Sequence, residues 1–146
     1  MIEHIYDELN VGDMDYVEKT ITETDVYQYA GITGDFSWLH VNEVRSRQGH
    51  FKKRVVHGML LVGLISNVVG NRMPGAGTIY ESQNIKFLLP CFINDTVRAQ
   101  TEVIEKMPRG RVKLRTSCFN QYGELILDGD AIAIPPREHI IKPASY

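Results

Sequence analysis

Two segments of the chain carry apolar residues at helical spacing, and the first lies between residues 22 and 34. Val26, Tyr29 and Ala30 are spaced so that they fall on one face of a helix. Threonines that can cap a helix stand at the start of this segment, and glycines that can end one follow it. The pattern predicts a short helix with a single buried face.

The second segment predicts a helix that is buried over most of its circumference. It runs from about His57 to Gly70, and its apolar residues surround the helix axis: Leu60, Leu61, Leu64, Ile65, Val68 and Val69. A helix that is apolar nearly all round belongs in a core. Gly70 and the Pro74-Gly75 pair that follows are expected to end it.

The strand pattern appears in five further segments, which alternate between apolar and polar residues or are bounded by turn residues. They cover residues 14–21, 79–88, 96–105, 111–119 and 125–134. The third is the clearest, since Val97 and Ala99 alternate with Arg98 and Gln100. Short turns between successive strands predict an antiparallel meander, and a buried helix against a curved sheet predicts an α+β fold.

Between the two helices, residues 35–56 are polar, basic and without periodicity. A segment of this length without its own regular structure is uncommon in a compact domain and usually has a function. The chemistry of the protein is therefore expected there.

Composition narrows the class of protein. The 146 residues are 43% hydrophobic and 23% charged, which fits one domain with a packed core over 1–146, ending in a short C-terminal tail at 137–146. The formal net charge is -2, which disfavours a nucleic-acid partner. Cys91 and Cys118 lack metal-type spacing and predict neither a disulfide scaffold nor a four-cysteine zinc site.

Targeting signals are not expected either. The first 15 residues are acidic, unlike a signal peptide. The longest apolar stretch, residues 59–69, is too short for a membrane span, which needs about 20 residues. We expect a cytoplasmic protein with no membrane partner.

The candidate catalytic groups are Asp35 and His40, which lie five positions apart after the first helix. Gly34 allows a sharp turn there, so both side chains can point into one pocket. A carboxylate and an imidazole can hold one water between them and exchange its protons, as addition or removal of water requires. The alternative is a solvent-facing loop in which the aspartate caps a turn.

Gly58 stands where the buried helix begins, and a substrate oxygen could approach its N–H closely, as in an oxyanion hole. The alternative is that this glycine only permits close packing of helix and sheet. Ser66 is a hydroxyl on the same apolar helix. It could line a pocket or bond Asp35, or it could bond a carbonyl of its own helix.

A basic run borders this segment: Arg45, Arg47, Lys52, Lys53 and Arg54. Such a run can bind the phosphates of a carrier such as coenzyme A, or it can be a solvated surface. His40, His50 and His57 are metal-ligand types as well, but no HxH or HExxH spacing is present, so no metal site is predicted.

The order of motifs resembles the MaoC-like dehydratases, and among them the R-specific enoyl-CoA hydratases. The resemblance runs from about residue 11 to residue 136. It is carried by residues 20–35, 39–40, 56–60, 87–90 and 95–97. It implies a hot-dog fold, an antiparallel sheet wrapped around a long central helix, and a homodimer with the two sheets joined edge to edge.

The resemblance also implies the roles of residues. Asp35 and His40 match the catalytic pair, which lies in an overhanging segment at residues 35–56. Gly58 matches the glycine whose N–H holds the thioester carbonyl, and Ser66 matches a serine near the pair. The implied reaction interconverts trans-2-enoyl-CoA and (R)-3-hydroxyacyl-CoA with no cofactor, since coenzyme A is part of the substrate.

One departure from the family pattern bears on function. Ser37-Trp38 stands where the family usually has Asn-Pro, which frees the loop and adds a large ring near the acyl pocket. Two alternatives stay open, and this departure is the reason for the second. The chain could be an acyl-CoA thioesterase on the same fold, or a non-catalytic subunit that binds acyl chains.

Overall fold

The structure, a computed structural model, describes residues 2–139. Most of the expected tail, residues 140–146, lies outside the described residues. Five strands form one sheet: β1 (Met14–Thr20), β2 (Ile79–Phe87), β3 (Thr96–Met107), β4 (Arg111–Phe119) and β5 (Leu125–Ile134). The helices are α1 (Glu23–Thr33), α2 (Trp38–Val41), α3 (Glu43–Ser46) and α4 (Gly58–Asn71), with short 3-10 turns at Tyr6–Glu8 and Pro108–Gly110.

The sheet is antiparallel throughout, with the strand order β1-β3-β4-β5-β2. The predicted meander is confirmed for β3, β4 and β5, which are joined by short turns. It is wrong for β2, which pairs with β5 and not with β3. The reason is the connection at residues 88–95, which turns away from the sheet and pairs with the chain before α4 through a Val55–Phe92 bridge.

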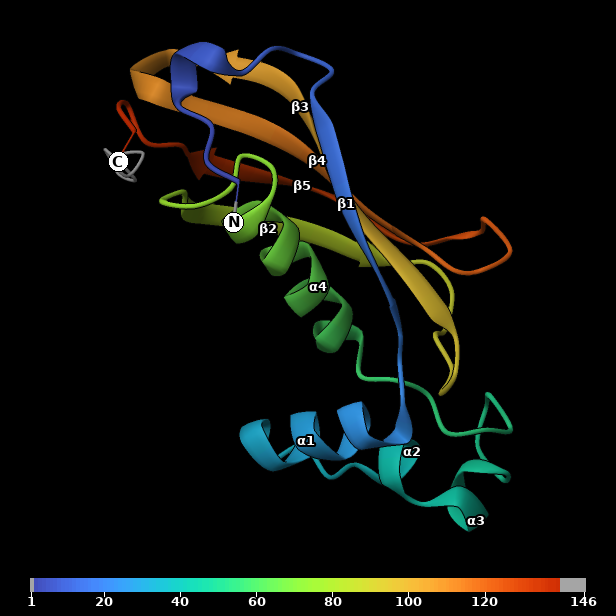
Figure 1. The fold of residues 1–146 in the computed structure, drawn as a ribbon. Coiled ribbons are helices and arrows are strands. Elements are labelled where there is room, and N and C mark those ends of the chain that lie inside the picture. Colours follow the sequence, from blue (N-terminus) through green and yellow to red (C-terminus); the bar gives the residue numbers. More distant parts are fainter. Residues whose placement is uncertain (1, 140–146) are drawn as a thin grey trace, which may run out of the picture.

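The curved sheet wraps around α4, as Figure 1 shows, and this is the hot-dog fold. The side chains of β3 explain the burial, because Val97, Ala99 and Val103 point toward α4 and are fully buried. Thr101 shares their face and donates a 2.8 Å hydrogen bond to the carbonyl of Met73, so its buried hydroxyl is satisfied.

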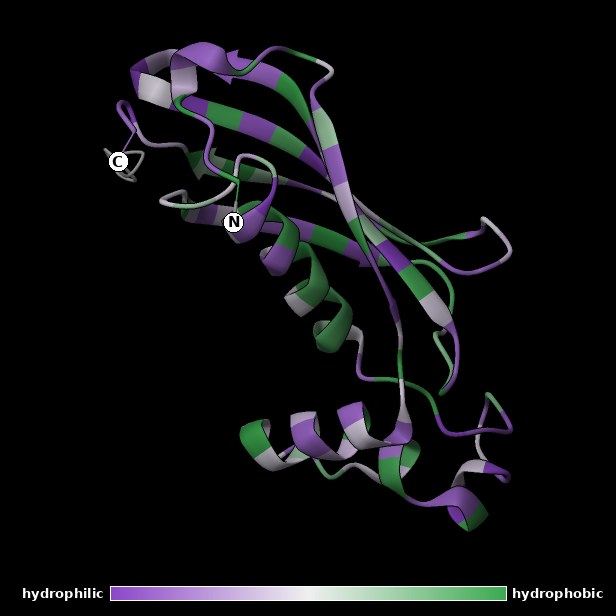
Figure 2. Cartoon of the chain, viewed as in Figure 1, coloured by the Kyte–Doolittle hydropathy of each residue, from purple (hydrophilic) through white to green (hydrophobic). Residues whose placement is uncertain are grey.

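Helix α4 is less enclosed than its sequence predicts. Figure 2 shows it as the most continuously apolar helix, and Leu61, Ile65 and Val68 are buried. However, its opposite face is exposed: Met59, Gly63, Ser66 and Asn67. Within residues 2–139, no helix combines the length and hydropathy that crossing a membrane requires.

The remaining helices form a layer beyond one end of the sheet, below α4 in Figure 1. Helix α1 begins at a capping box, in which the Thr22 hydroxyl accepts from the N–H of Asp25 while the Asp25 carboxylate accepts from the N–H of Thr22. It ends at Gly34, whose φ of 79° is left-handed. The overhanging segment at residues 35–56 contains the two short helices α2 and α3, which the sequence pattern did not predict.

Candidate active site

Asp35 is presented by the turn that ends α1. Its Oδ1 accepts a 3.2 Å hydrogen bond from the N–H of Ser37. Its Oδ2 lies 3.9 Å from Nε2 of His40 and 3.9 Å from Nε2 of His57. The side chain is half exposed, at 51%. One carboxylate oxygen is thus held by the loop, and the other faces two imidazoles.

His40 is oriented by the backbone that precedes α4. Its Nδ1 lies 2.7 Å from the carbonyl oxygen of Val55. A carbonyl can only accept, so in the neutral imidazole this bond assigns the proton to Nδ1 and leaves Nε2 with a lone pair that faces Asp35. The two nearest atoms of the pair are therefore both acceptors, and a donor with two hydrogens, such as water, fits between them.

His57 is a member of the cluster that the sequence pattern did not assign to catalysis. Its ring is 2% exposed and stacks on the ring of His40 at a centroid distance of 3.8 Å. Its Nε2 lies 3.0 Å from the main-chain oxygen of Asp35. The sequence does hint at a special role for His57, because it stands at the position before α4 where a capping residue such as Ser, Thr, Asp or Asn is favoured.

The same three side chains, Asp35, His40 and His57, are metal-ligand types with ligand atoms within 4.8 Å of one another. His50, the other histidine of this region, is exposed and packs edge-on against Phe51. A metal ion here would find Oδ2 of Asp35 and Nε2 of His40 open, but it would have to displace the bond from His57 to the backbone. The geometry therefore favours water over a metal.

Gly58 satisfies both interpretations of its sequence position. A Cβ placed on it would lie 2.6 Å from Cε1 of Phe87, so the glycine permits the close approach of the Phe87 ring to the start of α4. It is also the first residue of α4, and among residues 2–139 no acceptor is paired with its N–H. The N–H is available to a ligand oxygen.

Two adjoining cavities meet at these residues. A smaller cavity of about 160 Å³, which contains the polar groups of the cluster, is lined by Tyr29, Thr33, Asp35, His40, His57, Gly58 and Met59. An apolar cavity of about 450 Å³ shares His40, Gly58 and Met59 with it and continues along Phe51, Leu61 and residues 87–91. A polar reacting group and an apolar chain can therefore lie end to end across Gly58.

Two predicted pocket residues do not join the cluster. Trp38 lines neither of the two cavities, because its ring lies over Gly49, 3.1 Å from where a Cβ would stand there. Ser66 is exposed on the open face of α4 and lines neither cavity. In the single chain, both stand apart from Asp35 and His40.

The basic run divides into paired and unpaired residues. Arg54 is largely buried, at 14% exposed, and binds Glu23, Glu43 and the hydroxyl of Tyr27. Arg47 pairs with Glu43 at the surface. Three exposed cations make no ion pair with any described residue: Arg45, Lys52 and Lys53. Arg54 is thus a link between α1 and α3, and only the other three stay open for phosphates.

Replacing Arg54 by Gln is expected to lower the melting temperature by a few degrees at neutral pH. The Arg54 side chain lowers the pKa of Glu23 and of Glu43 below their ordinary 4.5. A carboxylate with a lowered pKa stabilises the fold above its ordinary pKa and loses that contribution as the pH falls. The difference between parent and Arg54→Gln should therefore shrink below pH 4.5.

Melting temperatures measured across pH test this, and Arg47→Gln is the matched control, because Arg47 pairs with Glu43 alone and is 72% exposed. A pH-independent difference for Arg54→Gln, or an equal loss in the control, would contradict the assignment of Arg54 as the link.

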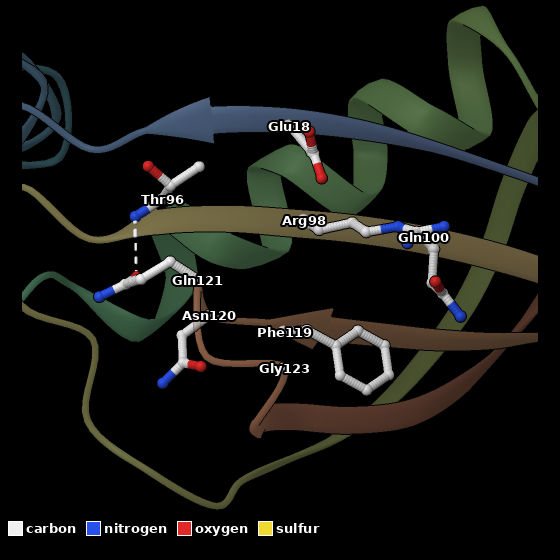
Figure 3. A pocket seen from close by; sticks show the side chains of 8 residues that line it. All are labelled: Glu18, Thr96, Arg98, Gln100, Phe119, Asn120, Gln121 and Gly123. Carbon is white, nitrogen blue, oxygen red and sulfur yellow. Dashed lines mark hydrogen bonds between the residues drawn. The ribbon is translucent and has the colours of Figure 1, made fainter.

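A separate cavity of about 370 Å³ lies over the outer face of the sheet, away from α4 (Figure 3). Its lining is polar and includes Glu18, Arg98 and Gln100, and Gln121 accepts a 3.1 Å hydrogen bond from the N–H of Thr96 across it. None of Asp35, His40 or Gly58 contributes to it. It is therefore not part of the candidate active site.

The two cysteines are free thiols buried in the core. Burial raises the pKa of Cys91 and of Cys118 to about 12. A thiol with this pKa carries almost no thiolate at neutral pH, so neither cysteine is a nucleophile.

Comparisons with known proteins give a single consistent result. The family described as "MaoC like domain" matches residues 12–118. An (R)-specific enoyl-CoA hydratase from Rhodospirillum rubrum is 39% identical over 137 residues, which cover 93% of this chain and 94% of that protein. A 3-hydroxybutyryl-CoA dehydratase from Methylorubrum extorquens is 37% identical and covers 94% of this chain and 88% of its own length.

A solved structure agrees with these sequence matches. An R-hydratase from Pseudomonas aeruginosa, in its unliganded form, superposes with a TM-score of 0.89 at 34% identity. The match covers 99% of this chain and 97% of that one. The whole described fold, including the layer that carries the histidine cluster, is thus shared with this structure.

Proposed function

Since the chain belongs to the MaoC-like domain family and is an enzyme of the hydratase and dehydratase class, we propose that it interconverts a trans-2-enoyl-CoA and the (R)-3-hydroxyacyl-CoA. The observation that carries the proposal is the pair of facing acceptors, Oδ2 of Asp35 and Nε2 of His40, 3.9 Å apart. The stereochemistry and the coenzyme A carrier come from the names of the relatives.

Water between Asp35 and His40 would donate one hydrogen to each acceptor. Its oxygen lone pair would then be free to attack C3 of the enoyl group. Asp35 acts mainly as the base that takes a proton from this water. His40 clamps the water through the lone pair at Nε2. The proton that Asp35 takes passes to this nitrogen, and His40 then delivers it to C2 as the acid, so both groups return to their starting states. The net change is the addition of one water, and the reverse sequence is the dehydration.

The N–H of Gly58 supports the other half of the reaction. As the water attacks C3, negative charge develops on the thioester oxygen, and an N–H already aimed at that oxygen stabilises the enolate. The apolar cavity beyond Gly58 would hold the acyl chain, and Arg45, Lys52 and Lys53 would meet the phosphates of coenzyme A. The reaction needs no metal or redox cofactor.

We also propose a homodimer that forms along β2. This strand is an edge of the sheet, and exposed apolar side chains gather beside it: Met59, Ile79, Phe87, Leu88 and Leu89. The opposite edge, β1, carries the charged residues Glu18 and Lys19, which discourage strand pairing. Light scattering should give twice the chain mass of 16.6 kDa.

The test of the proposed activity is hydration of crotonyl-CoA. The conjugated enoyl thioester should lose its ultraviolet absorbance as water adds across the double bond, while no free thiol is released. Release of thiol from a saturated acyl-CoA would instead identify a thioesterase. Binding of acyl-CoA without either change would identify a non-catalytic subunit.

A further inference from the structure

His57 occupies the position before α4 where a side chain normally caps the helix. Within residues 2–139, the His57 side chain accepts no hydrogen bond from the N–H groups at the start of α4, so it does not cap the helix. A good capping residue there would stabilise the helix. The ring turns away from the helix, and its Nδ1 is buried with no hydrogen-bond partner among residues 2–139. A buried polar atom without a partner is costly, so the position is not optimised for stability.

The ring is directed instead at the loop that carries Asp35. Every other hydrogen bond of residues 34–37 in the described structure is local, reaching no further than Ala30 or Val41. The bond from Nε2 of His57 to the carbonyl of Asp35, at 3.0 Å, is the exception and spans 22 residues. It is therefore the long-range hydrogen bond that ties the Asp35 backbone to the start of α4.

The same ring limits the movement of His40. The two imidazoles stack at 3.8 Å with an angle of 25° between their planes, and the ring of Tyr29 lies 4.8 Å away against His57. His40 is thus held by Val55 at one nitrogen and by His57 along its face. One residue touches both members of the proposed catalytic pair.

We propose that His57 is a positioning residue, which fixes the carboxylate of Asp35 through a hydrogen bond from Nε2–H to the Asp35 carbonyl. This inference rests on the proposed function. The carbonyl acceptor requires the Nε2–H tautomer and leaves Nδ1 with its lone pair. The unused Nδ1 is then the consequence of placing the only ring proton on the nitrogen that faces Asp35.

Two matched variants separate the two contacts of His57. His57→Gln keeps a side-chain N–H near the position of Nε2 and removes the ring. His57→Phe keeps a ring against His40 and removes the donor. If the hydrogen bond positions Asp35, kcat for crotonyl-CoA should fall about 10²-fold in His57→Phe, because small misplacements of a catalytic group have effects of this size.

The glutamine variant should keep kcat within about 10-fold of the parent, because the donor is retained. KM should change little in either variant. If His57 had only a structural role, its replacement would lower the fraction of folded protein. In that case kcat of the folded enzyme would not fall selectively, and glutamine would not restore it. Full activity in His57→Phe, or equal losses in both variants, would overturn the proposal.

A second measurement does not depend on activity. Long-range proton–nitrogen NMR of the parent should show His57 as the Nε2–H tautomer, with a ring proton that exchanges slowly with water. The Nδ1–H tautomer would overturn the proposal even in an active enzyme. If instead the parent fails to hydrate crotonyl-CoA while His57 shows the expected tautomer, the proposed function fails and the hydrogen bond to Asp35 stands.

Discussion

Replacing Asp35 by Asn is expected to lower the rate of crotonyl-CoA hydration by about 10²-fold or more, because an amide cannot take a proton from water. His40→Gln should have a comparable effect, since it removes the lone pair at Nε2 that faces Asp35. The two changes act on one shared water, so the double variant should be hardly slower than the slower single variant. Steady-state rates for the three variants beside the parent measure this.

Folding is not expected to suffer in the Asp35→Asn variant. The Asp35 side chain is half exposed, and its other oxygen makes only a local bond to Ser37. Asn can still accept that bond, so the melting temperature should stay close to that of the parent. Asp35→Asn and His40→Gln variants that turn over substrate as fast as the parent would remove both residues from the mechanism.

Gly58→Pro should lower kcat/KM by about 10²- to 10³-fold relative to Gly58→Ala, because only the proline removes the N–H proposed to hold the thioester oxygen. The comparison works because both substitutions add the same Cβ against Phe87. Proline is accepted at the first position of a helix. His57, with ψ of 125°, already has the extended backbone that a residue before proline needs.

The collision with the Phe87 ring is separable from the chemistry. That ring is 52% exposed and can move aside. Placing Phe87→Ala in both Gly58 variants should restore packing equally and leave the difference between proline and alanine intact. Equal rates for the two variants in this background would show that the N–H of Gly58 has no part in the reaction.

Much of the fold follows from local sequence signals. The threonines and glycines at the two ends of α1 predict caps there, because capping depends on neighbouring backbone groups. Thr22 and Gly34 cap the helix, whereas Thr24 and Gly31 lie inside it. Strand β4 has the predicted bounds, since its alternation is regular. The place of β2 beside β5 was not predictable, because strand order depends on the path of residues 88–95 and not on the pattern of β2 itself.

The candidate site was predictable only where a motif carries it. Asp35, His40 and Gly58 follow from the family pattern and come together in the structure. The contact of His57 with Asp35 spans 22 residues and that of Arg54 with Glu23 spans 31, so the local sequence does not show either partner. Trp38 lies near the pair in sequence but points away, because the short helix α2 turns its ring toward Gly49.

All the candidate catalytic groups lie between Tyr29 and Gly58, outside the strands, and one link from this stretch to the connection between β2 and β3 is the 2.8 Å hydrogen bond from the N–H of Val56 to the carbonyl of Cys91. The candidate catalytic groups and the buried residues of the strands are thus encoded in different parts of the chain. Substitutions in the strands away from this link will mostly alter how many molecules are folded, and each folded molecule will turn over as before. Mutations can therefore change the stability of the fold and the turnover rate of the folded enzyme separately.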